Sequence, residues 1–287
     1  MISSDEELKK ILPENGPDLN EVSKYIKKYK NEIIVIKYGG NVFIDRNIFN
    51  NFIDDLVILH KLGISVVVVH GGGPRIKRKL DQANITSKFV RGLRVTDDKI
   101  IKIVEDVLIE FNDDIVESLK IKGANAVSLN TKKNNVIEIV PENKELGFVG
   151  IPEKININII ESKIDQRLIP IISPLGLSHD RKTHNINGDT AAGAVAKSLQ
   201  CRRLLLMTNV EGVLNKQKKL IQEISSSKVE EMLKDGTITE GMIPKINTCL
   251  DAVHNGVTAV AIIDGRKKHS VLFEIFSDKG SGTLIRK

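Results

Sequence analysis

The chain is poor in the side chains that mark several common protein classes. Its 287 residues include no tryptophan, two cysteines and only 4% aromatic residues. The two cysteines, Cys201 and Cys249, are too few for a disulfide framework or a zinc cluster, and we expect both in the core. So few aromatic rings leave little for stacking on bases, and no nucleic-acid partner is expected.

Long apolar runs and one-sided charge are missing as well. No apolar run approaches the length needed to cross a membrane, so no membrane partner is expected. The N-terminus, Met1 to Glu7, is polar and acidic where a secretion signal would be basic and then apolar, which favours a cytoplasmic location. The net charge of +6 comes from bases that are mixed with acids, as is typical of solvated helix faces.

Three well-known sequence motifs are also absent. The chain has no G-x-x-x-x-G-K-[ST] loop, no G-x-G-x-x-G fingerprint and no G-x-S-x-G elbow. The missing motifs argue against a P-loop enzyme, a standard dinucleotide-binding protein and a lipase-type hydrolase, respectively.

Two glycine-rich turns follow two runs of β-forming residues. Residues 33–40 read IIVIKYGG and residues 66–74 read VVVVHGGGP. Glycines at the carboxyl end of a buried parallel strand leave backbone N–H groups at the sheet edge where α/β proteins bind ligands. Such groups suit a phosphate or a carboxylate, and Lys37 adds a cation. One Gly-Gly is most often only a tight turn, whereas two in succession favour a site.

Helix-like and strand-like segments alternate along the chain. Apolar residues recur at helical spacing in residues 19–29, 52–59 and 100–119, and strand-like runs lie between them. The alternation predicts an α/β fold, a three-layer αβα sandwich around a mostly parallel, doubly wound sheet. Residues 126–129 and 136–140 are expected to form a hairpin on the sheet surface.

We place a boundary between two lobes after the strand at residues 168–174. The expected units are an N-terminal extension with a helix (1–30), an N-terminal lobe (31–174) and a C-terminal lobe (175–287). The first two strands and the helix between them predict a right-handed crossover, which puts both glycine turns at one edge of the sheet. The two turns can therefore share a ligand.

Several side chains near this edge suit phosphoryl transfer. The reaction needs cations at the transferring phosphate and a group that holds the cations in place. Lys37 and Lys245 are the candidate cations, and Asp189 is the candidate organiser. Asn185 supplies an amide, and Arg94 can bind a carboxylate through two parallel hydrogen bonds. Each residue also has an alternative role outside any site: Asp189 could simply cap a helix, and the cationic side chains could simply be solvated.

Five motifs that contain these residues occur in order along the chain. They are KYGGN (37–41), HGGGP (70–74), GLRVTD (92–97), NINGDTAAG (185–193) and GMIPK (241–245). In this combination the chain resembles the N-acetylglutamate kinases of the amino acid kinase family, from Tyr25 to Leu284. The resemblance implies an amino acid kinase-like fold. It also implies transfer of the γ-phosphoryl group of MgATP to the γ-carboxylate of N-acetyl-L-glutamate, the second step of arginine biosynthesis.

The resemblance also implies roles for individual residues. Lys37 and Lys245 would stabilise the transition state, and Asp189 would organise both. The N-terminal lobe would bind the acyl amino acid and dimerise, and the C-terminal lobe would bind ATP, with Mg²⁺ carried by the ATP rather than held by the chain. The acid would contact Gly40, Gly72, Gly73, Arg94 and Asn185, and the nucleotide would contact Thr208, Asn209, Gly212, Val213, Leu214, Thr237 and Thr239. Asn209 departs from the family's usual aspartate.

The helix ahead of the first strand resembles the N-terminal helix of arginine-sensitive family members. That likeness implies inhibition by L-arginine and a hexamer built from dimers. We expect the apolar residues of this helix to be buried against another subunit. The expected effector contacts are Tyr25, His269, Glu274 and Gly280, with the carboxylate of Glu274 on the guanidinium and the glycine turn on the effector's own carboxylate.

Two other functions remain open at this stage. The chain could phosphorylate a different carboxylate, such as that of aspartate, glutamate or carbamate, or it could be a catalytically silent subunit that senses arginine. Arg94, in its Leu-Arg-Val-Thr setting, argues for an acylated amino acid. The joint presence of Lys37, Asp189 and Lys245 argues against a silent subunit.

Overall fold

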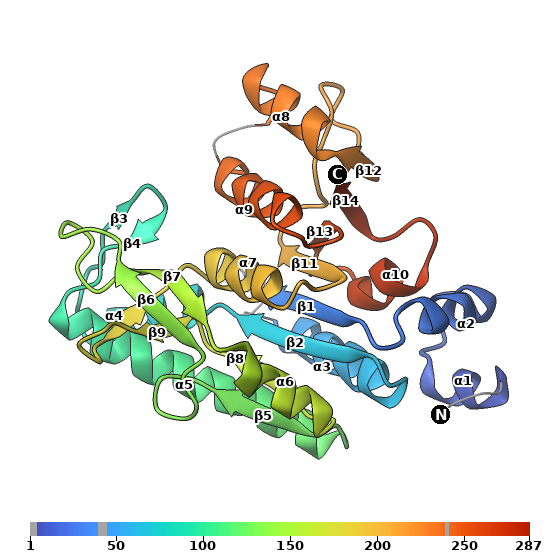
Figure 1. The fold of residues 1–287 in the computed structure, drawn as a ribbon, viewed down its shortest axis with the longest axis horizontal. Helices are drawn as coiled ribbons and strands as arrows, with labels where there is room; N and C mark the ends of the chain where they lie inside the picture. The colour runs from blue at the N-terminus through green and yellow to red at the C-terminus, as the bar shows by residue number, and fades with distance from the viewer. Residues whose placement is uncertain (1–4, 40–44, 239–240) are drawn as a thin grey trace.

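A computed structural model describes residues 5–39, 45–238 and 241–287 (Figure 1). One large sheet lies at its centre, made of β1 (Ile33–Tyr38), β2 (Ser65–His70), β5 (Ala126–Leu129), β8 (Ile169–Ile172), β11 (Arg203–Thr208), β12 (Glu223–Ser225), β13 (Val260–Asp264) and β14 (Gly282–Arg286). The strand order is β12-β14-β13-β11-β1-β2-β8-β5, and neighbours are parallel except for β13 and β14. The predicted α/β fold with a mostly parallel sheet is confirmed.

Helices cover both faces of this sheet and give the predicted three layers. They are α1 (Asp5–Ile11), α2 (Leu19–Lys28), α3 (Arg46–Lys61), α4 (Gly73–Gln82), α5 (Asp98–Ile121), α6 (Ile157–Asp165), α7 (Gly188–Ser198), α8 (Ser226–Lys234), α9 (Ile243–His254) and α10 (Ser270–Phe276). Residues of α2, α3, α5 and α10 share one core cluster, residues of α6 to α9 share a second, and residues of α4 and α5 form a smaller third one.

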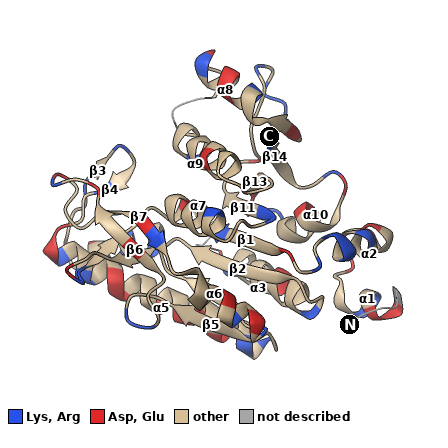
Figure 2. Ribbon diagram, viewed as in Figure 1, with Lys and Arg blue, Asp and Glu red and all other residues tan. Residues whose placement is uncertain are grey.

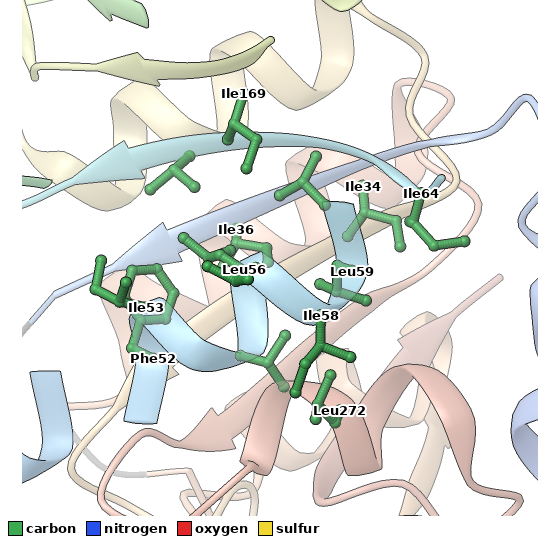
Figure 3. Packing of buried hydrophobic residues seen from close by; sticks show 14 of the residues in the cluster. Ile34, Ile36, Phe52, Ile53, Leu56, Ile58, Leu59, Ile64, Ile169 and Leu272 are labelled. Atoms are coloured by element: carbon green, nitrogen blue, oxygen red, sulfur yellow. The ribbon is translucent and has the colours of Figure 1, made fainter. Parts of the chain in front are cut away.

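Strand β1 shows how the sequence divides between the two faces. Its residues alternate, so that Ile34 and Ile36 pack into the cluster with α3 while Val35 packs into the cluster with α7. On the α3 side, Ile53 and Leu56 lie directly against the strand (Figure 3). Each fully buried aliphatic side chain of this kind stabilises the fold by about 1.5–3 kcal/mol.

Two smaller sheets lie beside the carboxyl edge of the large one. One contains β6 (Ile137–Pro141), β7 (Gly150–Ile155), β9 (Leu175–Leu177) and β10 (Thr183–Asn185) in the order β10-β9-β6-β7, and the other pairs β3 (Phe89–Val90) with β4 (Leu93–Arg94). The predicted hairpin of residues 126–140 is wrong. Both segments carry strand-forming residues but belong to different sheets. Strand β5 pairs with β8, far along the chain, and β6 pairs with the next strand, β7, so the turn between β5 and β6 does not join paired strands.

The predicted lobes correspond to two halves of the large sheet that meet where β1 pairs with β11. Strand β9 follows residue 174 yet pairs with β6, which precedes it, and β10 joins the same sheet by pairing with β9. The arrangement therefore favours a division some ten residues later than expected, and the two-lobe description stays a prediction. Acidic and basic residues are interspersed along the helices of both halves (Figure 2). None of the helices in the described part has the length and apolar character needed to cross a bilayer.

Helix α2 packs on its own chain. Asp18 caps it, with its side chain accepting the N–H of Asn20. Val22 and Tyr29, just after the helix, are buried in the cluster that contains Ile275 and Phe276 of α10, and α2 and α10 lie side by side (Figure 1). Val22 and Tyr29 therefore need no other subunit for their burial, but Tyr25 and Ile26 are only partly buried, so packing of this helix against another subunit stays a prediction.

Candidate active site

A cavity of about 230 Å³ opens at the carboxyl edge of the sheet, where β1 and β2 end beside α7. Six of the predicted site residues line it: Lys37, Gly72, Gly73, Arg94, Asn185 and Asp189. Gly40 lies outside the described residues. The structure therefore brings one predicted cation, the second glycine turn and the predicted substrate contacts together in one place.

Asp189 joins the two predicted lysines. Lys37 Nζ lies 2.8 Å from Asp189 Oδ1, and Lys245 Nζ donates a hydrogen bond of 2.7 Å to Asp189 Oδ2. The three side chains are only 8%, 17% and 16% exposed for Lys37, Lys245 and Asp189, respectively. They come from β1, α9 and α7, so their meeting depends on the tertiary fold. Two ammonium groups on one carboxylate leave a net charge of about +1 in a partly enclosed space.

Local backbone features make room for this cluster. A Cβ atom on Gly39 would lie 1.9 Å from Lys37 Nζ, so only glycine lets the ammonium fold back over the turn. Asn187 caps α7 by accepting the N–H groups of Asp189 and Thr190 at 2.9 and 3.1 Å. The capping role considered for Asp189 is thus performed by Asn187, which leaves the Asp189 carboxylate for the lysines.

The electrostatics of the cluster favour a bound anion. Burial opposes ionisation of Asp189, but the charges of Lys37 and Lys245 outweigh it and lower the pKa of Asp189. Burial and repulsion from Lys245 outweigh the attraction of Asp189 and lower the pKa of Lys37. A second negative charge would therefore stabilise the charged form of Lys37, which is what a transferring phosphoryl group supplies.

Arg94 also lines the cavity, and it forms no ion pair with a carboxylate of the described residues. It is 8% exposed. Its guanidinium donates to Ser87 Oγ and stands 4.6 Å above the ring of Phe89. Burial lowers the pKa of Arg94, although arginine stays charged in proteins. A ligand carboxylate would give this buried cation its missing partner.

The sequence did not reveal the apolar wall of the cavity. Phe89, Leu93, Val149 and Ile186 contribute to the lining. Phe89 is 59% exposed on the β3–β4 hairpin, an unusual position for a phenylalanine in a chain with so few aromatic residues. No pattern in the sequence marks these residues, because they come from three separate segments that only the fold brings together.

Thr208, Asn209, Gly212, Val213 and Leu214 lie at and just after the end of β11, and none of the predicted nucleotide contacts that the structure describes lines the cavity. Thr208 is buried at the end of β11, and its hydroxyl lies 3.4 Å from Asn209 Oδ1. Gly212 has a φ of 144°, and the N–H of Val213 donates to Thr283 Oγ1 at 2.8 Å. Leu214 is 39% exposed. Thr237 bonds to Asp235. Thr239 lies outside the described residues.

Most of the predicted effector residues gather between α2, α10 and the segment after α10. The hydroxyl of Tyr25 donates to Asp278 Oδ1 at 2.7 Å. Glu274 is 5% exposed and accepts the N–H of Ser281 at 2.9 Å, and a Cβ on Gly280 would lie 2.7 Å from Glu274 Oε2. Burial raises the pKa of Glu274, so a cationic ligand would favour its ionised form.

His269 has a different neighbour. Its Nδ1 lies 2.6 Å from Asp55 Oδ1 on α3, and both side chains are buried. The contact found for His269 is therefore with the helix beneath α10. An effector role for this histidine receives no support from that contact and stays a prediction.

Comparison with known sequences gives a consistent result. Residues 32–264 match the amino acid kinase family. An acetylglutamate kinase from Pelagibacter ubique is 54% identical over 283 residues, which cover 99% of this chain and 98% of that protein. An acetylglutamate kinase from Clostridioides difficile is 44% identical over 279 residues, covering 96% and 98%, respectively.

Solved structures share the fold. The N-acetylglutamate synthase of Neisseria gonorrhoeae, in complex with coenzyme A and N-acetyl-glutamate, superposes with a TM-score of 0.84 at 25% identity. The match covers 93% of this chain but only 62% of the synthase chain. The carbamate kinase of Giardia lamblia bound to AMP-PNP gives a TM-score of 0.67 at 18% identity, covering 89% of this chain and 98% of that one, and so supports the fold alone.

Proposed function

Because this chain belongs to the amino acid kinase family and is 54% identical to an acetylglutamate kinase over almost its whole length, we propose that it phosphorylates N-acetyl-L-glutamate with ATP. An oxygen of the substrate γ-carboxylate attacks the γ-phosphorus, the bond to the bridging oxygen breaks, and ADP leaves with the electron pair. The product is an acyl phosphate for arginine biosynthesis.

The observation that carries this proposal is the lysine pair on Asp189. Charge builds up on the transferring phosphoryl group and the leaving oxygen, and fixed cations stabilise it best when they need no rearrangement during the reaction. Lys37 and Lys245 are held by one buried carboxylate at 2.8 and 2.7 Å. Asp189 thus fixes both ammonium groups while leaving a surplus positive charge for the phosphate.

We assign the cavity to the acid substrate. Arg94 would bind its α-carboxylate, and Asn185 would bind a polar group of the acylated amino acid. Gly72 and Gly73 line the same cavity and would donate N–H groups near the reacting atoms. The residues after β11 would bind the nucleotide. Since both oxygens of Asp189 contact lysines, the Mg²⁺ that accompanies ATP would be held by phosphate oxygens.

We further propose that L-arginine binds between α2 and α10 and inhibits the enzyme, and that the protein is a cytoplasmic hexamer built from dimers. The buried carboxylate of Glu274 and the nearby Asp278 support the first part, because a guanidinium needs such partners. Inhibition would follow if arginine binds one arrangement of subunits better than another. The oligomer rests on the resemblance of the N-terminal helix alone.

Hydroxylamine trapping of the acyl phosphate tests the main proposal. N-acetyl-L-glutamate is compared with free glutamate, aspartate and carbamate at equal concentration. We expect product from N-acetyl-L-glutamate to exceed that from the others, because a site that hydrogen-bonds the acetamide leaves that partner unpaired when the acyl group is missing. Equal or greater product from another acid would favour the alternative kinase, and no product from any acid would favour the silent arginine-sensing subunit.

A further inference from the structure

A fully buried histidine stands directly before the second glycine turn and has no part in the reaction proposed above. His70 ends β2 and is 0% exposed. Its Nδ1 lies 2.8 Å from the carbonyl oxygen of Gly71. Its Nε2 lies 3.2 Å from Nδ2 of Asn112, a 0% exposed residue of α5, and the same Nδ2 donates to the carbonyl oxygen of Ile171 at 3.0 Å.

These contacts determine which nitrogen of His70 carries the proton. The carbonyl oxygen of Ile171 only accepts hydrogen bonds, so Asn112 must turn its NH₂ group toward it. The second hydrogen of that NH₂ group then points at Nε2 of His70, which must accept. The ring hydrogen therefore sits on Nδ1 and is donated to Gly71. Burial lowers the pKa of His70 to about 4, so the ring is neutral, as this pattern requires.

The bond to Gly71 sets the direction of the next N–H group. In a trans peptide the C=O of one residue and the N–H of the following residue point in opposite directions. A Gly71 oxygen held against the buried ring therefore turns the N–H of Gly72 away from the ring, and Gly72 lines the cavity. In the part of the chain that the structure covers, the Gly71 N–H binds Tyr38 and the Gly72 oxygen binds Ile76, but the Gly72 N–H has no acceptor.

We propose that His70 and Asn112 are positioning residues that aim the Gly72 N–H at the reacting oxygens. The assignment rests on the proposed phosphoryl transfer, because only then does a fixed donor at this place affect the rate. Removing one such preorganised donor typically costs on the order of 10²-fold in kcat, since it acts mainly on charge that develops in the transition state.

Paired substitutions at His70 separate hydrogen bonding from packing. Asparagine and leucine have nearly the same shape, but only asparagine carries a donor close to where Nδ1 lies in histidine. We expect His70→Leu to lower kcat by about 10²-fold with KM values for both substrates changed much less, and His70→Asn to recover most of the loss. Thermal unfolding of both variants shows whether they are folded. Equal losses in the two variants would overturn the proposal.

A second measurement does not depend on the reaction. In ¹⁵N-histidine-labelled full-length protein without ligands, the His70 resonances, assigned by their loss in His70→Asn, should report a proton on Nδ1 and none on Nε2. Asn112→Leu should weaken this preference and lower kcat less than His70→Leu. The opposite tautomer in the wild type would overturn the positioning proposal. An enzyme with the expected tautomer but no phosphorylation of N-acetyl-L-glutamate would instead contradict the proposed function.

Discussion

Two carboxylates, the largely buried Asp189 at the cavity and the buried Asp55 beneath α10, have different surroundings and different roles. Asp189 faces the two ammonium groups of Lys37 and Lys245, which lower its pKa against the effect of burial. Asp55 faces His269 and accepts backbone N–H groups of Val271 and Leu272, yet burial prevails and raises its pKa to about 6.

The difference lies in the balance of charge. The cluster around Asp189 has more cationic groups than acids and opens into a cavity, so it is completed by an anionic ligand. The cluster around Asp55 is closed. Its carboxylate meets the N-terminal N–H groups of α10 and one imidazole, and its side chain is only 3% exposed. The cluster around Asp189 is therefore suited to binding a reacting anion, whereas the cluster around Asp55 holds α10 against α3.

The largest effect is expected from breaking the closed cluster. Asp55→Ala should lower the free energy of unfolding by about 3–5 kcal/mol, because it leaves a buried imidazole and buried N–H groups without a partner. Chemical denaturation measures the loss. Activity per folded molecule should stay near that of the wild type, since Asp55 does not line the cavity.

Asp54→Ala is the matched control for this prediction. Asp54 precedes Asp55 on α3 and pairs with Lys122, but the two side chains are 43% and 35% exposed. An exposed pair contributes about 1 kcal/mol or less. Equal losses of stability in the two variants would mean that burial does not distinguish these two carboxylates.

The pH dependence of stability should also differ between the clusters. Between pH 3.8 and about 6 the folded protein keeps a proton on Asp55 that the unfolded chain has lost, so the free energy of unfolding falls as pH rises through this window. The fall amounts to at most about 3 kcal/mol. Asp55→Asn should remove this slope in denaturation curves measured from pH 4 to 6.

Asp189→Asn provides the contrast. The pKa of Asp189 is lowered, so its contribution to stability is present above the unfolded value of 3.8 and is lost only as pH falls below it. This substitution should leave the slope between pH 4 and 6 unchanged. A slope that survives in Asp55→Asn would show that Asp55 does not titrate in this window.

The lysine pair should affect turnover rather than folding. Lys37→Ala and Lys245→Ala should each lower kcat by on the order of 10²-fold or more, equivalent to about 2.7 kcal/mol, because each cation meets charge that develops in the transition state. Lys197→Ala is the control. Lys197 pairs with Asp251 between the same two helices, α7 and α9, but away from the cavity lining. A normal kcat in either Lys37→Ala or Lys245→Ala would remove that lysine from the proposed mechanism.

Sequence alone led to the fold and to much of the site, for identifiable reasons. The two glycine turns follow apolar strands, and parallel strands place their carboxyl ends at one edge, so Lys37 and the second turn could be brought together before the structure was known. Lys245 and Asp189 are candidates from the sequence alone, but grouping them with Lys37 depended on the resemblance, because no local pattern relates α7 to α9.

What the sequence could not supply depends on distant contacts. The pairing of β5 with β8, the apolar wall with Phe89 and the burial of α2 against α10 all arise from segments far apart in the chain. Asn112 gives no signal either, because it is an ordinary polar residue in an amphipathic helix until the fold places it against His70. His269 was assigned to the effector by its neighbours in sequence, whereas its contact lies with Asp55.

The smallest expected effect tests whether the region around α10 also carries regulation. Tyr25→Phe removes the hydroxyl that donates to Asp278 and should raise the arginine concentration for half-inhibition several-fold, since one such hydrogen bond contributes about 1 kcal/mol. Lys24→Ala, which removes an exposed ion pair with the same Asp278, should change it less. Both variants should keep the wild-type kcat without arginine, because no residue of α2 lines the cavity. A wild-type enzyme that keeps full activity in millimolar arginine would refute the effector site. The contacts between α2 and α10 would then serve only to stabilise the fold.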